Sequence, residues 1–143
     1  MTRKQAENAE RMTEKPTLLH KELTDQILQS FFAVYNALGY GFLEHVYANS
    51  LSLELRKRGL RVEREVRVEV QFEGQLVGVF RMDMTVNGIV IVEIKAGSAI
   101  AEADRRQLFN YLRAASVPVG LLLHFGPAPQ FKRFVWTGRQ FDR

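Results

Sequence analysis

Two acidic residues and a lysine, separated by a turn signal, are the part of this sequence best suited to chemistry. Asp83 precedes the dipeptide Asn87-Gly88, and Glu93 and Lys95 follow it. Alternate side chains of a β-strand point to opposite faces, so Glu93 and Lys95 are expected on one side of a sheet. A lysine among apolar residues on a buried strand is costly unless a carboxylate or a phosphate partners it. The three side chains could hold a divalent cation beside a water molecule.

The register of the hairpin decides whether Asp83 joins this pair. A two-residue loop at Asn87-Gly88 would place Asp83 opposite Val92 and would put the two acids on opposite faces. A three-residue loop with a glycine bulge, which Asn-Gly also favours, would place Asp83 opposite Ile91 and on the face of Glu93. We predict this odd-length register.

With that register, the cluster suits hydrolysis of a phosphodiester. Asp83 and Glu93 would offer oxygen ligands to Mg²⁺, which polarises a phosphate and lowers the pKa of a bound water. Lys95 would orient or deprotonate that water and offset the charge that grows on the phosphate. Short charged strings also recur by chance. The alternative is therefore a surface salt bridge between Glu93 and Lys95 beside an unrelated aspartate.

Two helical patterns could add to the cluster. Glu44, Tyr47 and Leu51 share one side of a predicted helix, which puts an acid on a stripe expected to face protein. The alternative is a glutamate that only favours the helix N-terminus. Gln107 and Tyr111 lie one turn apart on a later helix, where such a pair can grip a phosphate or an extruded base. The alternative is a solvated helix face with a packed tyrosine.

The periodicity of apolar residues predicts the elements that must position these side chains. Helical spacing predicts three helices, over Leu23–Leu38, Phe42–Arg58 and Glu102–Ala115. Alternating or continuous apolar runs predict five strands, over Val62–Phe72, Leu76–Val86, Ile89–Ala96, Val117–Phe125 and Phe131–Thr137. The predicted order is α, α, β, β, β, α, β, β, and the first three strands should form an antiparallel meander.

Length and composition fit one globular domain, since 143 residues with 46% hydrophobic and 25% charged side chains can bury a core. Residues 1–17 are polar and end near Pro16, so we predict a flexible leader followed by a single domain over residues 18–143. No apolar run reaches the ~18 residues of a membrane span. We expect a cytoplasmic protein without a membrane partner.

The absence of cysteine leaves oxygen or imidazole ligands for any metal. Carboxylate ligands favour Mg²⁺ or Mn²⁺. The net charge of +4 suits a polyanionic partner without requiring one. Several arginines could form a surface that follows a phosphate backbone, and a solvated basic face explains them equally well.

Four motifs together resemble a known family: Gly41-x-x-Glu44-x-x-Tyr47, Asp83, Glu93-x-Lys95 and Gln107-x-x-x-Tyr111. Their order is similar to that of the GxxExxY proteins, a group of the PD-(D/E)XK nuclease superfamily, and the resemblance spans Leu23 to Val135. It implies a restriction-endonuclease-like α/β fold, in which helices flank a mixed central sheet and a hairpin carries the active site.

The resemblance also implies residue roles. Glu44 would assist metal binding, Asp83 and Glu93 would ligate Mg²⁺, and Lys95 would act on the water. Gln107 and Tyr111 would contact DNA. Met82 stands where the superfamily pattern has proline, which removes no ligand.

We therefore expect a Mg²⁺-dependent nuclease with DNA as its substrate. The alternative is a non-catalytic module that keeps the nuclease fold and binds nucleic acid or protein. A homodimer is a further expectation, because a domain of this size covers little duplex.

Overall fold

The computed structural model describes residues 19–138 and has the predicted order of elements, ααβββαββ. The helices are α2 (Lys21–Leu38), α3 (Glu44–Lys57) and α4 (Glu102–Ala115). The strands are β1 (Val62–Phe72), β2 (Gln75–Val86), β3 (Val90–Ala96), β4 (Val119–Phe125) and β5 (Pro129–Val135). The predicted leader, residues 1–17, lies outside the described residues. None of the described helices is long and apolar enough to cross a membrane.

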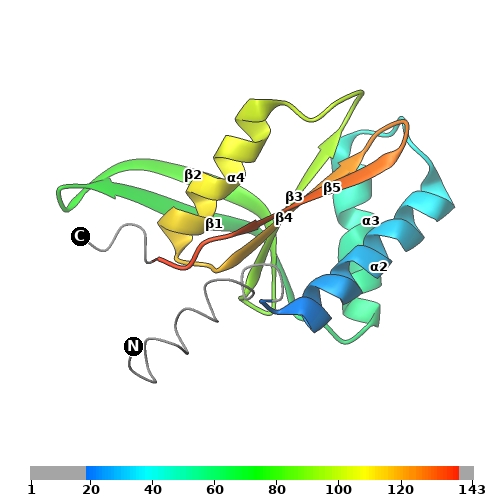
Figure 1. The fold of residues 1–143 in the computed structure, drawn as a ribbon, viewed down its shortest axis with the longest axis horizontal. Helices are drawn as coiled ribbons and strands as arrows, with labels where there is room; N and C mark the ends of the chain where they lie inside the picture. Colours follow the sequence, from blue (N-terminus) through cyan, green and yellow to red (C-terminus); the bar gives the residue numbers. More distant parts are fainter. Residues whose placement is uncertain (1–18, 139–143) are drawn as a thin grey trace, which may run out of the picture.

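The five strands form one mixed sheet in the order β1-β2-β3-β4-β5 (Figure 1). The pair β3–β4 is parallel, and the other three neighbouring pairs are antiparallel. A parallel pair needs a long crossover connection, and α4 provides it between β3 and β4. This topology confirms the predicted α/β fold with a mixed sheet flanked by helices.

Each face of the sheet has its own hydrophobic core. Val92 and Ile94 of β3 pack with α2 and α3 on one face, in a cluster that includes Phe31 and Leu51. Ile91 of β3 points the other way and packs with side chains of α4. Glu93 and Lys95 alternate with Val92 and Ile94, so they emerge on the α4 face, as the sequence predicts.

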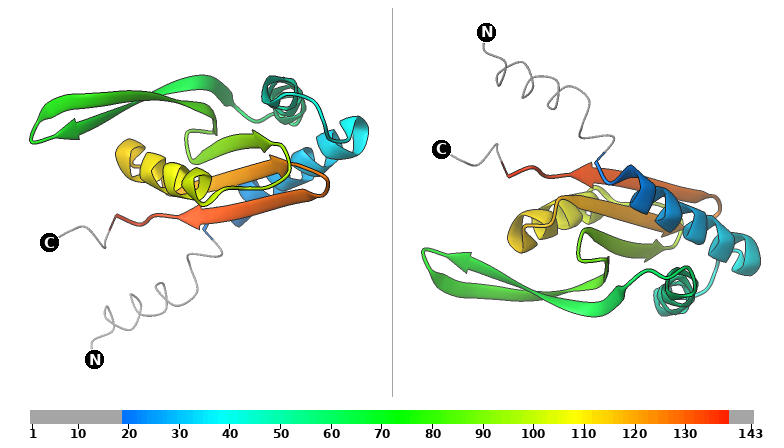
Figure 2. Two further views of the ribbon diagram at one scale, coloured as in Figure 1. Left: turned by 90° about the horizontal axis from the view of Figure 1, so that it is seen from above. Right: turned by 90° about the horizontal axis from the view of Figure 1, so that it is seen from below.

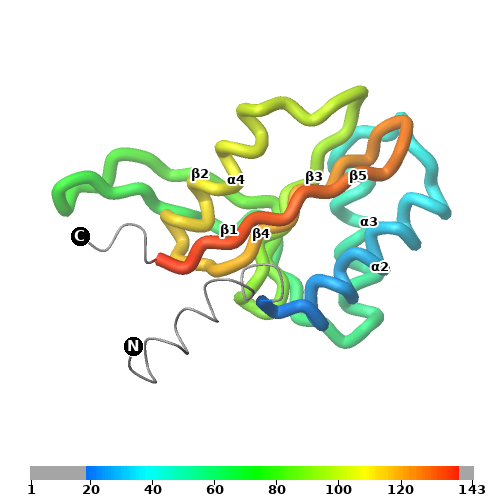
Figure 3. Tube along the Cα trace, viewed as in Figure 1, coloured from blue at the N-terminus to red at the C-terminus, as the bar shows by residue number. Residues whose placement is uncertain are grey.

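The outer part of the β1–β2 hairpin leaves the sheet. Pairing between β2 and β3 is confined to residues 84–86 and 90–92, whereas β1 pairs with β2 along the whole hairpin. Residues 66–82 therefore form a two-stranded arm, which reaches past the other strands and curves over α4 (Figures 2 and 3). Val68 and Met82 hold the arm against α4 by packing with Leu108 and Leu112.

The β2–β3 loop has the predicted odd length but a shifted register. Val86 pairs with Val90, so the loop contains Asn87, Gly88 and Ile89. The expected pairing of Asp83 with Ile91 is wrong, because Thr85 lies opposite Ile91. Buried Val86 stays in the strand, and the left-handed residues Asn87 and Gly88 occupy the first two loop positions. A shift of two residues preserves the alternation of faces.

Candidate active site

Asp83 lies where β2 separates from β3. The last backbone pair of the two strands is Met84 with Val92. Beyond it, the Oδ2 atom of Asp83 accepts a hydrogen bond of 2.7 Å from the backbone N–H of Ile94. The Asp83 side chain thus accepts a hydrogen bond from β3 at a point where the backbone of β2 no longer pairs with that strand. This bond fixes the carboxylate at the point where the sheet opens.

Glu93 is buried beside Asp83, with only 5% of its surface exposed. Its pKa is raised to about 9, first by burial and then by the negative charge of Asp83 and a side-chain hydrogen bond to it, while the charge of Lys95 acts in the opposite direction. The Oε1 atom of Glu93 is buried without a hydrogen-bond partner. Two adjacent carboxyl groups with an unsatisfied oxygen form a site that a cation would stabilise.

Lys95 extends toward α4 from the same face of β3. Its Nζ atom lies 3.6 Å from Oδ1 of Asp104, and the lysine side chain is 24% exposed. It is close enough to Glu93 for its charge to affect that carboxyl. Buried Glu93 beside Asp83 does not fit the alternative of a surface salt bridge with an unrelated aspartate nearby.

Glu44 begins α3 on the other side of β3. Its Oε2 atom accepts a hydrogen bond of 3.2 Å from the backbone N–H of Ala96, at the end of the strand that carries Glu93. Tyr47 and Leu51 are buried, but Glu44 is exposed, so the expectation that it faces protein is wrong. Its place in the first helical turn leaves its side chain at the edge of the core.

The described residues contain no group of three or more acidic, histidine or cysteine side chains close enough to hold a metal. The carboxyl groups brought together are those of Asp83 and Glu93. The role of Glu44 as a third metal ligand stays a prediction.

Tyr47 shows what the tyrosine of the Gly41-x-x-Glu44-x-x-Tyr47 motif does in this fold. Its hydroxyl donates a hydrogen bond of 2.8 Å to the carbonyl oxygen of Gly39 and accepts one of 3.2 Å from the backbone N–H of Phe42. Its ring stacks on that of Phe125, with 4.1 Å between the ring centroids. Tyr47 therefore anchors the loop that leads into Glu44. The sequence places this tyrosine on a buried stripe but gives no sign of its backbone partners.

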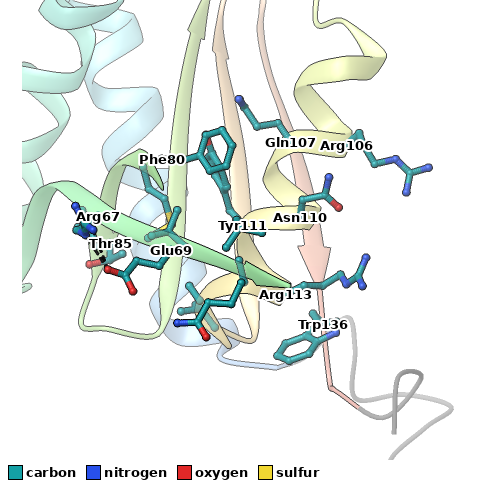
Figure 4. A pocket seen from close by; sticks show the side chains of 18 of the residues that line it. Arg67, Glu69, Phe80, Thr85, Arg106, Gln107, Asn110, Tyr111, Arg113 and Trp136 are labelled. Atoms are coloured by element: carbon teal, nitrogen blue, oxygen red, sulfur yellow. Dashed lines mark hydrogen bonds and ion pairs between the residues drawn. The ribbon is translucent and has the colours of Figure 1, made fainter. Parts of the chain in front are cut away.

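Tyr111 of α4 lies near the acidic pair. It is 7% exposed, and its pKa is raised by burial and then by the charges of Glu93 and Asp83. Gln107, one turn earlier, is exposed, and both residues line a groove beside the arm (Figure 4). The predicted helical pair therefore lines one groove, with Tyr111 near the carboxyl groups and Gln107 exposed.

The groove runs between the arm and α4 and encloses about 1370 Å³. Phe80 of the arm faces Tyr111 across it (Figure 4). Arg67 and Glu69 contribute from β1, and Arg106 contributes from α4. Sequence reasoning misses this groove, because it arises only when the arm curves over the helix.

Comparisons with known proteins agree with this fold. The sequence profile of the PD-(D/E)XK nuclease superfamily matches residues 21–134, so the chain belongs to this superfamily. Nucleases of this superfamily generally use divalent metal ions. No curated protein matches the sequence significantly.

Among solved structures, the fold is similar to the crystal structure of SSO0001, with a TM-score of 0.50 and 20% sequence identity. The match covers 67% of this chain and 51% of that chain, so it spans about half of the longer protein. A likeness at this identity supports the fold alone.

Proposed function

We propose that this protein is a Mg²⁺-dependent nuclease that hydrolyses phosphodiester bonds of DNA at Asp83, Glu93 and Lys95. The observation that supports this function is the acidic pair, in which Glu93 is buried beside the half-buried Asp83 and one oxygen of Glu93 has no hydrogen-bond partner. Burying the carboxyl group of Glu93 beside a second acid costs stability, and a fold that keeps it there favours a cation as the common partner of the two groups.

The donor set fits Mg²⁺. This ion is usually bound by one or two carboxylates and keeps several waters and substrate phosphates as its other ligands. Asp83 and Glu93 would hold it, and Mn²⁺ has the same preference for carboxylate oxygen. When bound, the ion supplies charge stabilisation at the phosphate and a more acidic water. Glu44 is the proposed additional ligand, from the end of β3 marked by its bond to Ala96.

In the proposed reaction Lys95 acts on the attacking water. Its side chain is partly exposed, and Asp104 restrains its ammonium group from the side of α4. An ammonium at this place would orient the attacking water, or accept its proton when neutral, and would offset the charge on the phosphate. Gln107 and Tyr111 would contact the DNA beside the scissile bond.

A non-catalytic nucleic-acid-binding module is the second candidate. It is favoured by the described residues' lack of a cluster of three metal-binding side chains. Such a module would use the same groove without breaking a bond. The two functions therefore differ in cleavage and agree in binding.

Cleavage of plasmid, linear duplex and single-stranded DNA with Mg²⁺ or Mn²⁺ separates these candidates. We expect wild-type protein to cleave at least one substrate and Lys95→Ala to be at least about 100-fold slower. Lys132→Ala, which removes an exposed lysine of β5, is the matched control and should keep wild-type activity. Binding by the wild type without cleavage of any substrate would favour the module. Light scattering on the same sample tests the proposed homodimer.

A further inference from the structure

We propose that the groove between the arm and α4 binds single-stranded nucleic acid, with Phe80 as a platform on which a base stacks. This inference rests on the proposed function and names its substrate as a single strand. It is carried by the size of the groove, the exposure of Phe80, the contact of Phe80 with Tyr111, and the charges on α4.

The groove is large, and one of its lining residues, Tyr111, lies near the acidic pair. Its volume of about 1370 Å³ exceeds the roughly 300–1,000 Å³ of pockets for small ligands, so it suits several units of a polymer. Tyr111 lines the groove and also feels the charges of Glu93 and Asp83. A chain lying in the groove would therefore reach the carboxyl groups past this tyrosine.

Phe80 is an aromatic side chain that the core does not bury. It is 45% exposed and points into the groove from β2 (Figure 4). Every base has an aromatic face, so an accessible phenyl ring binds unpaired bases with little regard to sequence. Trp136, after β5, adds a second aromatic side chain to the same groove.

The contact across the groove favours a single strand over a duplex. The centroid of the Phe80 ring lies 6.0 Å from that of the Tyr111 ring, with an angle of 47° between the ring planes. The arm and the helix therefore approach to contact distance beside the carboxyl groups. The bases of a duplex are stacked on each other and offer no free face to Phe80, whereas unpaired bases do.

The charges place the phosphates on the side of α4. Arg67 on the arm forms an ion pair of 2.9 Å with Glu69, which offsets its charge. Arg106 lines the groove from α4. A strand with its backbone along α4 and its bases toward Phe80 would match both sides of the groove.

Fluorescence anisotropy tests this assignment with the full-length protein, a labelled 12-nucleotide oligothymidine and a labelled 12-base-pair duplex. EDTA in the buffer prevents metal-dependent cleavage, so the result does not depend on nuclease activity. Phe72→Ala is the matched control, because Phe72 is an arm phenylalanine that is 65% exposed and does not line the groove.

We expect the oligothymidine to bind more tightly than the duplex. Phe80→Ala should weaken oligothymidine binding roughly 5- to 150-fold, the equivalent of one lost stacking contact. Phe72→Ala should stay within about twofold of wild type, and circular dichroism should show that both variants fold. Equal or tighter binding of the duplex, or no effect of Phe80→Ala, would overturn the assignment. Either result would leave the proposed nuclease activity standing, and loss of cleavage alone would leave the groove assignment standing.

Discussion

Replacing Glu93 with glutamine should remove a pH-dependent loss of stability from the metal-free protein. The pKa of Glu93 is about 9 in the folded protein, against an ordinary value of 4.5. The folded state therefore binds more protons than the unfolded state between these two pH values. By linkage, the free energy of unfolding must fall as the pH rises through this window. The stabilisation of the folded state that comes from protonated Glu93 is fully present below pH 4.5 and is lost by about pH 9.

The size of the effect follows from the slope. One titrating group changes the free energy of unfolding by at most about 1.4 kcal/mol per pH unit. The titration of Glu93 should therefore lower the free energy of unfolding by roughly 2.7 kcal/mol between pH 6 and pH 8. In a domain of this size each kcal/mol shifts Tm by about 2–4 °C, which gives a fall of roughly 5–11 °C. Glu93→Gln cannot ionise and should lose this part of the pH dependence.

Thermal unfolding in EDTA at pH 6, 7 and 8 measures the difference between wild type and Glu93→Gln. Titrating groups distant from Glu93 affect both proteins alike, so the comparison isolates Glu93 and the groups that interact with it. Glu73→Gln, at the exposed turn of the arm, is the control and should keep the wild-type slope. Parallel pH profiles for wild type and Glu93→Gln would refute the reasoning that Glu93 is a buried acid beside Asp83.

Three further predictions follow from the same contacts. Mg²⁺ at about 100 times its Kd should stabilise the wild type by roughly 2.7 kcal/mol in thermal unfolding and should leave Glu93→Gln unchanged, and an equal gain in both would argue against this ligand. Asp83→Asn keeps an acceptor for the N–H of Ile94, so at pH 6 it should be about 1–3 kcal/mol more stable to urea than Asp83→Ala. Tyr47→Phe removes the hydroxyl that bonds Gly39 and Phe42, so hydrogen exchange in residues 39–43 should quicken, and unchanged protection there would contradict its anchoring role.

Local patterns in the sequence were enough to predict the elements and their order. The change from helical spacing to alternation near Val62 marks the start of the sheet, and the alternation of Val92 and Ile94 with Glu93 and Lys95 predicts their opposite faces. The strand ends differ by a few residues, as in β5, which begins at Pro129 instead of Phe131. Strand ends depend on cross-strand pairing, which residue propensity does not encode.

Contacts between distant segments account for what the sequence could not predict. The odd loop length was predictable from Asn87-Gly88, but its register depended on the burial of Val86 in the core. The exposure of Glu44 depends on how α3 packs against β3. The departure of β2 from β3 at Asp83 depends on the arm packing against α4. The groove and the position of Phe80 follow from that same packing.

Anomalous scattering from crystals soaked in Mn²⁺ shows whether Asp83 and Glu93 hold one metal ion, because it locates a metal without relying on activity. We predict a peak whose distances to carboxylate oxygens of both Asp83 and Glu93 are about 2.0–2.6 Å, with Lys95 nearby. A well-ordered site without a peak between these two carboxyl groups, or a peak held by other residues, would contradict the account.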